Sequence, residues 1–419
     1  MATGTSSPAS WWRRPLAYLV AGIVVLGFTG GIAYVLLSST GYVPFVSIKQ
    51  VWETPVDRKA AKHGNGAWLV GDTVVRSRYD AVTGFDAGSG KKRWEYLPPR
   101  RTEICAASTV ADDSVALIAY SQKGKGCDTV AALDLTEGRE LWRTAVVPVK
   151  GEEAASVRDV ATGGGLAVVQ QGAVAVRVFD LRTGTPRWQA ALPKGCTPYT
   201  TAAATKQVLA VLTCGDELKL AAFDPADGKE RWTVPLDDRR GVSAETEVTF
   251  ESVEPIVLGV SDGTSVFSPT TLTALAFGPD GRPQAHIEGS GEYGRISDMA
   301  IANGRLFAVA TYKGSRSELE QIVAFDLASG DELWREGGGG GGSDPGALRA
   351  EGDRVLFLVD SHRYGDRMLV YDAATGEEEE DRKFREEPVA SQDLLTYKDL
   401  LIVVRWGEGV RPFTAYERW

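Results

Sequence analysis

The sequence predicts an all-β protein, an eight-bladed β-propeller of four-stranded blades preceded by one N-terminal transmembrane helix. Three observations carry this prediction. A short motif recurs about every 47 residues, β-rich apolar segments precede each copy, and one early strand-like segment has a Trp but no motif. A repeat period in this range is typical of solenoids, propellers and arrays, and four short strands per repeat favour propeller blades.

The motif consists of an aromatic residue or Leu, then Asp, a Gly four residues after the Asp and a Trp four residues after the Gly. Its five complete copies are Asp86, Gly90 and Trp94; Asp134, Gly138 and Trp142; Asp180, Gly184 and Trp188; Asp224, Gly228 and Trp232; and Asp326, Gly330 and Trp334. Two copies are eroded. The copy at Tyr371 has Glu380 at the Trp position, and the copy at Phe277 lacks both the motif Asp and the Trp. A last copy begins at Tyr416 and is interrupted by the end of the chain.

Each motif is interpreted as the hairpin between the third and fourth strands of a blade. Asp accepts hydrogen bonds from turn amides, and Gly supplies a positive φ. The Trp then lies on the fourth strand, where its indole is expected to dock against the next blade, because it buries a large apolar area and keeps one N–H donor. Two further apolar runs precede the motif, as in residues 116–120, and complete four strands.

The number of blades follows from the strands around the motif. Eight third strands are predicted, but only seven are followed by a fourth strand. Residues 47–52 have strand composition and include Trp52, so we expect them to complete the last blade and close the ring. Such closure covers two open sheet edges. Seven blades is the alternative if the eroded repeat at Phe277 is not a full blade.

An uncharged stretch of 23 residues, Pro15 to Leu37, precedes the repeats and is long enough to span a bilayer as a helix. Arg13 and Arg14 come directly before it, and the next charge is Lys49, so the positive-inside rule places the N-terminus in the cytoplasm. The predicted organisation is a cytoplasmic tail at 1–14, a transmembrane helix at 15–37, a tether at 38–46 and an extracytoplasmic propeller at 47–419. A cleaved signal peptide is the competing interpretation.

The four cysteines form two pairs with matching contexts, Cys105 with Cys127 and Cys196 with Cys214. The members of each pair are predicted at the same end of a hairpin. An even number of cysteines outside the cytoplasm favours disulfides, and four free buried thiols are the alternative.

Charge and motif content limit the function classes. The net charge is −10, and Arg13 and Arg14 contribute +2, which leaves about −12 outside and argues against nucleic acid or anionic membrane surfaces as partners. The Gly-x-Ser-x-Gly match at 259–263 is interpreted as a turn inside a blade, because a strand and not a helix is predicted after it. His63, His286 and His362 lie in different repeats. We therefore expect no catalytic, cofactor-binding or metal-binding residues.

The repeat resembles that of pyrroloquinoline-quinone (PQQ) dehydrogenases and their non-enzymatic relatives, over roughly residues 47–419. The enzymes typically carry a Cys-Cys pair, a calcium site and often a haem domain, but this sequence has no Cys-Cys pair and no Cys-x-x-Cys-His motif. It is more similar to the cofactor-free branch, such as the lipoprotein of the outer-membrane β-barrel assembly machine and the sensor domains of some bacterial kinases. It departs from that lipoprotein in its anchor, because its first cysteine is Cys105 and no cysteine near the N-terminus could carry a lipid.

The resemblance implies a membrane-tethered, non-enzymatic binding or scaffold module for a protein, peptide or envelope ligand, without a cofactor. Two alternatives are a quinone-dependent dehydrogenase and a sensor module for a separately encoded signalling partner.

Overall fold

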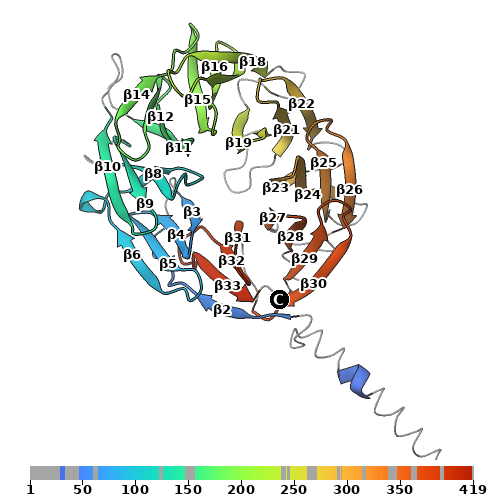
Figure 1. Ribbon diagram of the computed structural model, residues 1–419. Helices are drawn as coiled ribbons and strands as arrows, with labels where there is room; N and C mark the ends of the chain where they lie inside the picture. The colour runs from blue at the N-terminus through green and yellow to red at the C-terminus, as the bar shows by residue number, and fades with distance from the viewer. Residues whose placement is uncertain are drawn as a thin grey trace, which may run out of the picture.

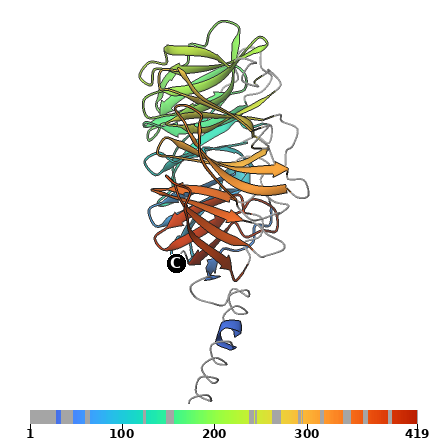
Figure 2. The same ribbon diagram turned by 90° about the vertical axis from the view of Figure 1, so that its right-hand side faces the viewer.

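The computed structural model describes residues 29–33, 47–59, 65–121, 126–146, 156–236, 242, 246–261, 271–289, 293, 295–313, 318–337, 347–359, 366–386 and 391–417. Its strands form a closed ring of radial sheets (Figure 1), and the ring is narrower when seen edge on (Figure 2).

Eight antiparallel four-stranded sheets make up the ring. The strands of each blade are given from the inner to the outer one. Blade 1 contains β3 (Gly66–Val70), β4 (Thr73–Arg78), β5 (Ala81–Asp86) and β6 (Lys92–Tyr96), and blade 2 contains β7 (Ile104–Ala107), β8 (Val115–Tyr120), β9 (Thr129–Asp134) and β10 (Arg139–Ala145). Blade 3 contains β11 (Val157–Gly163), β12 (Leu166–Gln171), β13 (Ala175–Asp180) and β14 (Pro186–Gln189), and blade 4 contains β15 (Cys196–Ala203), β16 (Val208–Cys214), β17 (Glu217–Phe223) and β18 (Glu230–Leu236). A short 3-10 helix, η1 (Pro99–Arg101), joins blades 1 and 2.

The second half of the ring repeats the plan. Blade 5 contains β19 (Glu247–Val253), β20 (Ile256–Ser261), β21 (Thr271–Phe277) and β22 (Pro283–Glu288), and blade 6 contains β23 (Arg295–Ala302), β24 (Arg305–Lys313), β25 (Glu318–Asp326) and β26 (Glu332–Gly337). Blade 7 contains β27 (Ala347–Glu351), β28 (Arg354–Val359), β29 (Arg367–Asp372) and β30 (Glu378–Phe384), and blade 8 contains β31 (Asp393–Tyr397), β32 (Leu400–Val404), β33 (Phe413–Glu417) and β2 (Gln50–Glu53). The eroded repeat at Phe277 is a full blade, so the eight-bladed prediction is confirmed and the seven-bladed alternative is wrong.

The N-terminal segment closes the ring. Strand β2 pairs antiparallel with β33 and places Trp52 opposite Ala415. The preceding β1 (Ser47–Ile48) adds to blade 7 instead, in parallel with the end of β30. The predicted strand at 47–52 is therefore split between two blades, and it spans their joint.

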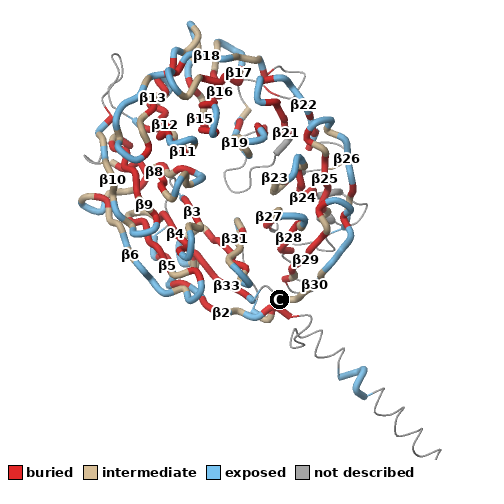
Figure 3. Tube along the Cα trace, in the orientation of Figure 1, coloured by how far each residue is buried: buried red, intermediate tan, exposed pale blue. Residues whose placement is uncertain are grey.

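Hydrophobic packing lies between the blades. The described residues form eight buried clusters, one for each interface between neighbouring blades. The two middle strands of a blade pack on both sides, so most of their residues are buried; every residue of β8 is buried, for example. The outer strands are largely exposed, as Figure 3 shows. Apolar side chains on both faces of a sheet fit a blade enclosed by two neighbours.

The connections differ between the two faces of the ring. The turn from the first to the second strand takes two residues in six of the eight blades, as between Val70 and Thr73. At the opposite face the connections are longer, with eight residues between β8 and β9 and eleven between β10 and β11. We refer to these as the short-turn face and the long-connection face.

Most of the predicted transmembrane segment lies outside the described residues. Residues 29–33 are helical and exposed. Within the described part, no helix combines the length and apolar character needed to span a membrane. The tail at 1–14 and the tether at 38–46 are likewise outside it.

Candidate functional site

The motif Trp residues lie between consecutive blades. Four of them donate an indole hydrogen bond to a backbone carbonyl of the next blade: Trp142 to Leu181 (2.8 Å), Trp188 to Pro225 (2.9 Å), Trp232 to Pro279 (3.2 Å) and Trp334 to Ala373 (3.2 Å). Trp52 and Trp94 occupy the same position, packed on Gly90 and Gly138 of the following blades. We call each pair of a Trp and the motif Gly beneath it a latch.

The Gly of a latch is required for two reasons. Gly184 has a φ of +69°, which favours glycine, and a Cβ atom at this position would lie 2.6 Å from Cδ2 of Trp142. The ring of the Trp therefore lies directly on the turn of the next blade.

The motif Asp residues hold their own turns. Oδ1 of Asp372 accepts hydrogen bonds from the amides of Ala374 (2.9 Å) and Thr375 (2.7 Å). Oδ1 of Asp180 likewise accepts a hydrogen bond from the amide of Thr183, and its Oδ2 pairs with Arg187 at 2.5 Å. The contact with Arg187 lowers the pKa of Asp180 to about 2. An Arg seven residues after the Asp recurs in three blades, as Arg93, Arg187 and Arg231, a regularity that the sequence analysis missed.

Two joints have no latch. Ala285 stands at the Trp position of blade 5, four residues after Gly281, and the backbone of Thr271 pairs there with Ile296 of blade 6. Glu380 stands at the Trp position of blade 7, and the strap formed by β1 and β2 crosses this joint.

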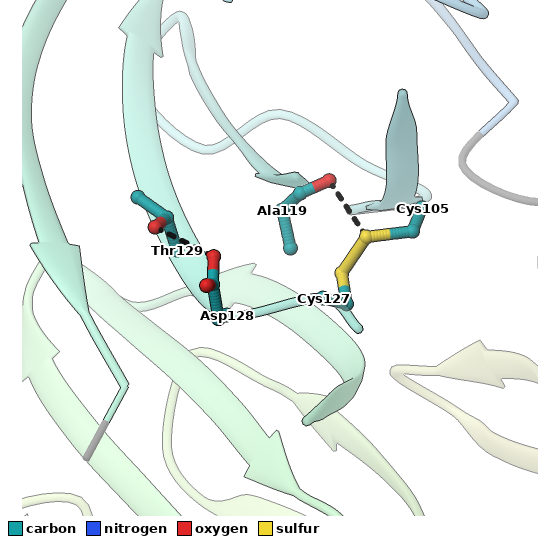
Figure 4. The surroundings of a disulfide bond; sticks show 5 residues. All are labelled: Cys105, Ala119, Cys127, Asp128 and Thr129. Carbon is teal, nitrogen blue, oxygen red and sulfur yellow. Dashed lines mark hydrogen bonds between the residues drawn. A yellow bond between two sulfur atoms is a disulfide. The ribbon is translucent and has the colours of Figure 1, made fainter. Parts of the chain in front are cut away.

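Both predicted disulfides are present. Cys105 joins Cys127 with a Cα–Cα distance of 6.0 Å, and Cys196 joins Cys214 with 4.1 Å. Each links the start of an inner strand to the far end of the next strand or the connection after it, at the long-connection face. In Figure 4, Sγ of Cys105 also lies 3.4 Å from the carbonyl oxygen of Ala119.

A cavity of about 410 Å³ lies among the inner strands of the ring. It is lined by the inner strands β11, β15 and β19 of three consecutive blades, which face the centre in Figure 1, and by Thr109 and Val110 of blade 2. The lining residues come from the ends of these strands nearest the short-turn face. Its polar groups are threonine hydroxyls, Ser252 and carboxylates: Thr109, Thr162, Thr200, Thr201, Thr249, Asp159, Glu251 and Glu254.

Carboxylates on inner strands reach from one blade to the next. Oδ2 of Asp159 accepts hydrogen bonds from Oγ1 of Thr200 (3.1 Å) and the amide of Thr201 (3.2 Å), and Oδ1 accepts from Val160 (2.8 Å). Burial raises the pKa of Asp159 despite these donors.

Asp298 repeats this arrangement three blades later. Its Oδ2 accepts from the amide of Leu348 at 2.7 Å, and its Oδ1 accepts from Met299 at 2.8 Å. Burial, together with the smaller effect of the carboxylates of Asp393 and Glu251, raises its pKa to about 7. Acidic groups on the inner strands of blades 5, 6 and 8 thus act on one another.

The sequence analysis did not single out these carboxylates. The signal that could have found them is an Asp inside a predicted inner strand and directly followed by an apolar residue, as in Asp159-Val160 and Asp298-Met299.

The catalytic motifs weighed in the sequence have no catalytic surroundings in the described residues. Ser261 is the last residue of β20, and residues 262 and 263 lie outside the described part, as do His63 and His362. Ser89, which with Lys92 matches a Ser-x-x-Lys pattern, donates to Asp86 within the first motif turn at 2.7 Å. Among the described residues, no group of three or more His, Cys, Asp and Glu side chains could hold a metal ion.

Comparison with known proteins bears on the family. The family described as outer membrane protein assembly factor BamB matches residues 47–200 and 128–270, together more than half of the chain. The chain belongs to this family. Its repeats are those of a PQQ-like β-propeller.

Solved structures share the fold with the chain. BamB from Moraxella catarrhalis is 15% identical with a TM-score of 0.55, and the match covers 88% of this chain and 99% of that one. The computationally designed Ika8 protein is 13% identical with a TM-score of 0.56, over 88% and 99%. A europium-containing methanol dehydrogenase is 12% identical with a TM-score of 0.49, over 85% and 84%. Among curated proteins, no match was found.

PQQ is the cofactor of the enzymatic relatives of BamB-type propellers, so its fit can be tested against the cavity. The quinone bears carboxylate groups, and the cavity is lined by Asp159, Glu251 and Glu254, whose like charges would repel it. Arg349, on the inner strand of blade 7, already donates to the carbonyl of Leu394 at 2.8 Å. The described residues do not fit this cofactor.

Proposed function

We propose that this BamB-family propeller is a non-enzymatic binding or scaffold module, tethered to the membrane by an N-terminal helix and located outside the cytoplasm. Its ligand is a protein, a peptide or another envelope component. The propeller comprises residues 47–419, and residues 15–37 form the anchor.

The observation that carries the proposal is the use made of the repeat residues. The Asp residues hold turns, and the Gly and Trp residues form latches, so the repeated side chains build the ring. What remains for function is the cavity among the inner strands and the two faces of the ring. These are surfaces for binding, and the family's description as an assembly factor favours a protein partner.

Two further observations support the location. Arg13 and Arg14 directly before an uncharged stretch favour a cytoplasmic N-terminus. Two disulfides with no free cysteine among the described residues fit an oxidising compartment.

Protease treatment of intact spheroplasts tests the topology. We expect added protease to degrade the propeller while leaving a fragment of the anchor. Full protection of the propeller would reverse the orientation.

Affinity capture from membranes tests the binding role. The tagged full chain is cross-linked in cells and purified next to a tagged chain of residues 1–46, which has the anchor without the propeller. A partner retained at constant ratio by the full chain and absent from the control supports the proposal. Equal recovery with both chains contradicts it.

Calorimetry tests the absence of an enzymatic role. We expect the purified full chain to bind no PQQ, with or without calcium, because the lining of the cavity is acidic. Stoichiometric, calcium-dependent binding would replace the scaffold proposal by a dehydrogenase.

A further inference from the structure

We propose that the cavity formed by β11, β15 and β19 binds the ammonium group of a lysine side chain that a protein or peptide partner presents at the short-turn face. This inference rests on the proposed function as a binding module and names the chemical group recognised.

Thr201 is the first observation that points to a ligand. Its side chain is only 4% exposed, it lines the cavity, and its hydroxyl has no hydrogen-bond partner among the described residues. Leaving a buried hydroxyl unpaired costs about 1–3 kcal/mol. A donor in the cavity would satisfy it if the Thr201 side chain rotates toward the ligand on binding.

Asp159 lines the same cavity and contacts the same residue through its backbone, because its Oδ2 accepts the amide of Thr201 at 3.2 Å. Within the described part of the chain, Asp159 forms no ion pair. Its carboxylate is half-buried, and burial raises its pKa, as is typical of an acidic group short of a counter-charge. A cation next to Thr201 would supply that charge.

The lining matches an ammonium group better than a metal ion or an anion. An ammonium has three donors and no acceptor, and the cavity offers hydroxyl and carboxylate acceptors from three strands. The described residues contain no group of side chains suited to a metal ion.

The apolar part of the cavity fits the stem of the same side chain. Val110, Val160 and Val253 line it, and Val110 is 53% exposed. Lysine buries its methylene groups on such surfaces while the charged end finds polar partners. The volume of about 410 Å³ is within the ~300–1,000 Å³ typical of ligand pockets.

Binding of a fluorescent hexalysine peptide to the full chain, followed by anisotropy, tests the inference. Thr201→Val removes the unpaired hydroxyl without removing volume, and it should weaken binding about 5-fold while leaving thermal stability equal or higher. Thr83→Val is the matched control, because Thr83 is also 4% exposed and its hydroxyl also lacks a partner, but it lies on β5 of blade 1, away from the cavity. It should leave affinity unchanged.

Asp159→Asn tests the charge. It should weaken binding by about 10-fold or more, as expected for loss of a charge-assisted contact. Asp280→Asn, at an exposed turn of blade 5, makes the same change in net charge and should alter affinity less than 2-fold. Hexalysine with acetylated amines should bind neither the unchanged full chain nor its variants.

The inference would be overturned if Thr201→Val and its control Thr83→Val weakened binding equally, or if Asp159→Asn and its control Asp280→Asn did. The affinity for the peptide would then follow stability or net charge. Absence of hexalysine binding would also overturn it. Neither result touches the proposed function, which depends on whether the propeller retains a partner that the anchor alone does not.

Discussion

At the scale of single residues, the motif Gly and the Trp of the preceding blade act as one unit. The Gly provides both a backbone conformation and an empty place for the indole, so a substitution there has two separate costs. The costs can be separated because the same blade contains a positive-φ glycine with free space around it, Gly165.

Gly184→Ala should destabilise the protein more than Gly165→Ala. The φ values of the two residues are similar, +69° for Gly184 and +75° for Gly165. A Cβ atom added at Gly184 would lie 2.6 Å from Trp142, whereas one added at Gly165 would have no neighbouring atom within 4 Å. Backbone strain should cost about 1–2 kcal/mol at both positions, and overpacking should add about 1–3 kcal/mol at Gly184 alone. Denaturant unfolding measures both. Equal losses would mean that the indole moves aside freely.

Asp298 should make stability fall as the pH rises. Its pKa is about 7 in the folded protein against 3.8 in the unfolded chain, so the folded state binds the extra proton between these values. Stability is then full below about pH 4 and declines through pH 7, by up to about 4 kcal/mol. Asp298→Asn should flatten this part of the profile, although it lowers stability overall by removing one acceptor.

The control for this profile is Asp331→Asn, at an exposed turn residue, which should leave the decline unchanged. The readout is the slope of unfolding free energy against pH between 4.5 and 7.5. An unchanged slope in Asp298→Asn would show that other groups control this range.

At the scale of strands and blades, the joints follow the state of the motif. Where the Trp and Gly are both present, a latch forms. Where Glu380 replaces the Trp, the N-terminal strap crosses the joint. Where Ala285 replaces it, the backbone of Thr271 pairs with the next blade. At each of the two joints without a latch, backbone pairing thus provides a link between the blades.

Trp52→Ala should weaken ring closure. Trp52 is 8% exposed on β2 and packs on Gly90 of blade 1, so truncation should cost about 3–5 kcal/mol, the range for large aromatic residues in cores. Val51→Ala on the same strand is the control, because Val51 is 45% exposed, and it should cost less than about 0.5 kcal/mol. A loss below about 1 kcal/mol for Trp52→Ala would contradict its role in closing the ring.

The sequence predicted the blades but not the cavity, for a physical reason. Blade elements depend on local patterns, such as Asp and Gly in a turn and Trp on the next strand, and these recur at a fixed spacing. The cavity depends on residues from three blades, such as Asp159, Thr201 and Glu251, which no spacing relates. The split of residues 47–53 into two strands was also not predictable, because both halves have the same strand composition.

At the scale of the whole molecule, the ring has two chemically different faces. The disulfides lie at the long-connection face, in blades 2 and 4, and the cavity opens toward the short-turn face, between blades 3 and 5. The bridges therefore hold inner strands at the end opposite to the cavity. They stabilise the sheets that form its wall without occupying it.

Thiol chemistry on the intact protein tests both the bridges and the compartment. An alkylating reagent under denaturing, non-reducing conditions should label no cysteine, and peptide mapping should recover Cys105 linked to Cys127 and Cys196 linked to Cys214. Because the bridges close segments of 22 and 18 residues, chain entropy assigns each about 3 kcal/mol, with a difference of about 0.2 kcal/mol between them. Replacing either pair by Ala should therefore lower stability by similar amounts. Labelling of all four cysteines in protein taken directly from cells would place the propeller in a reducing compartment and contradict the proposed location.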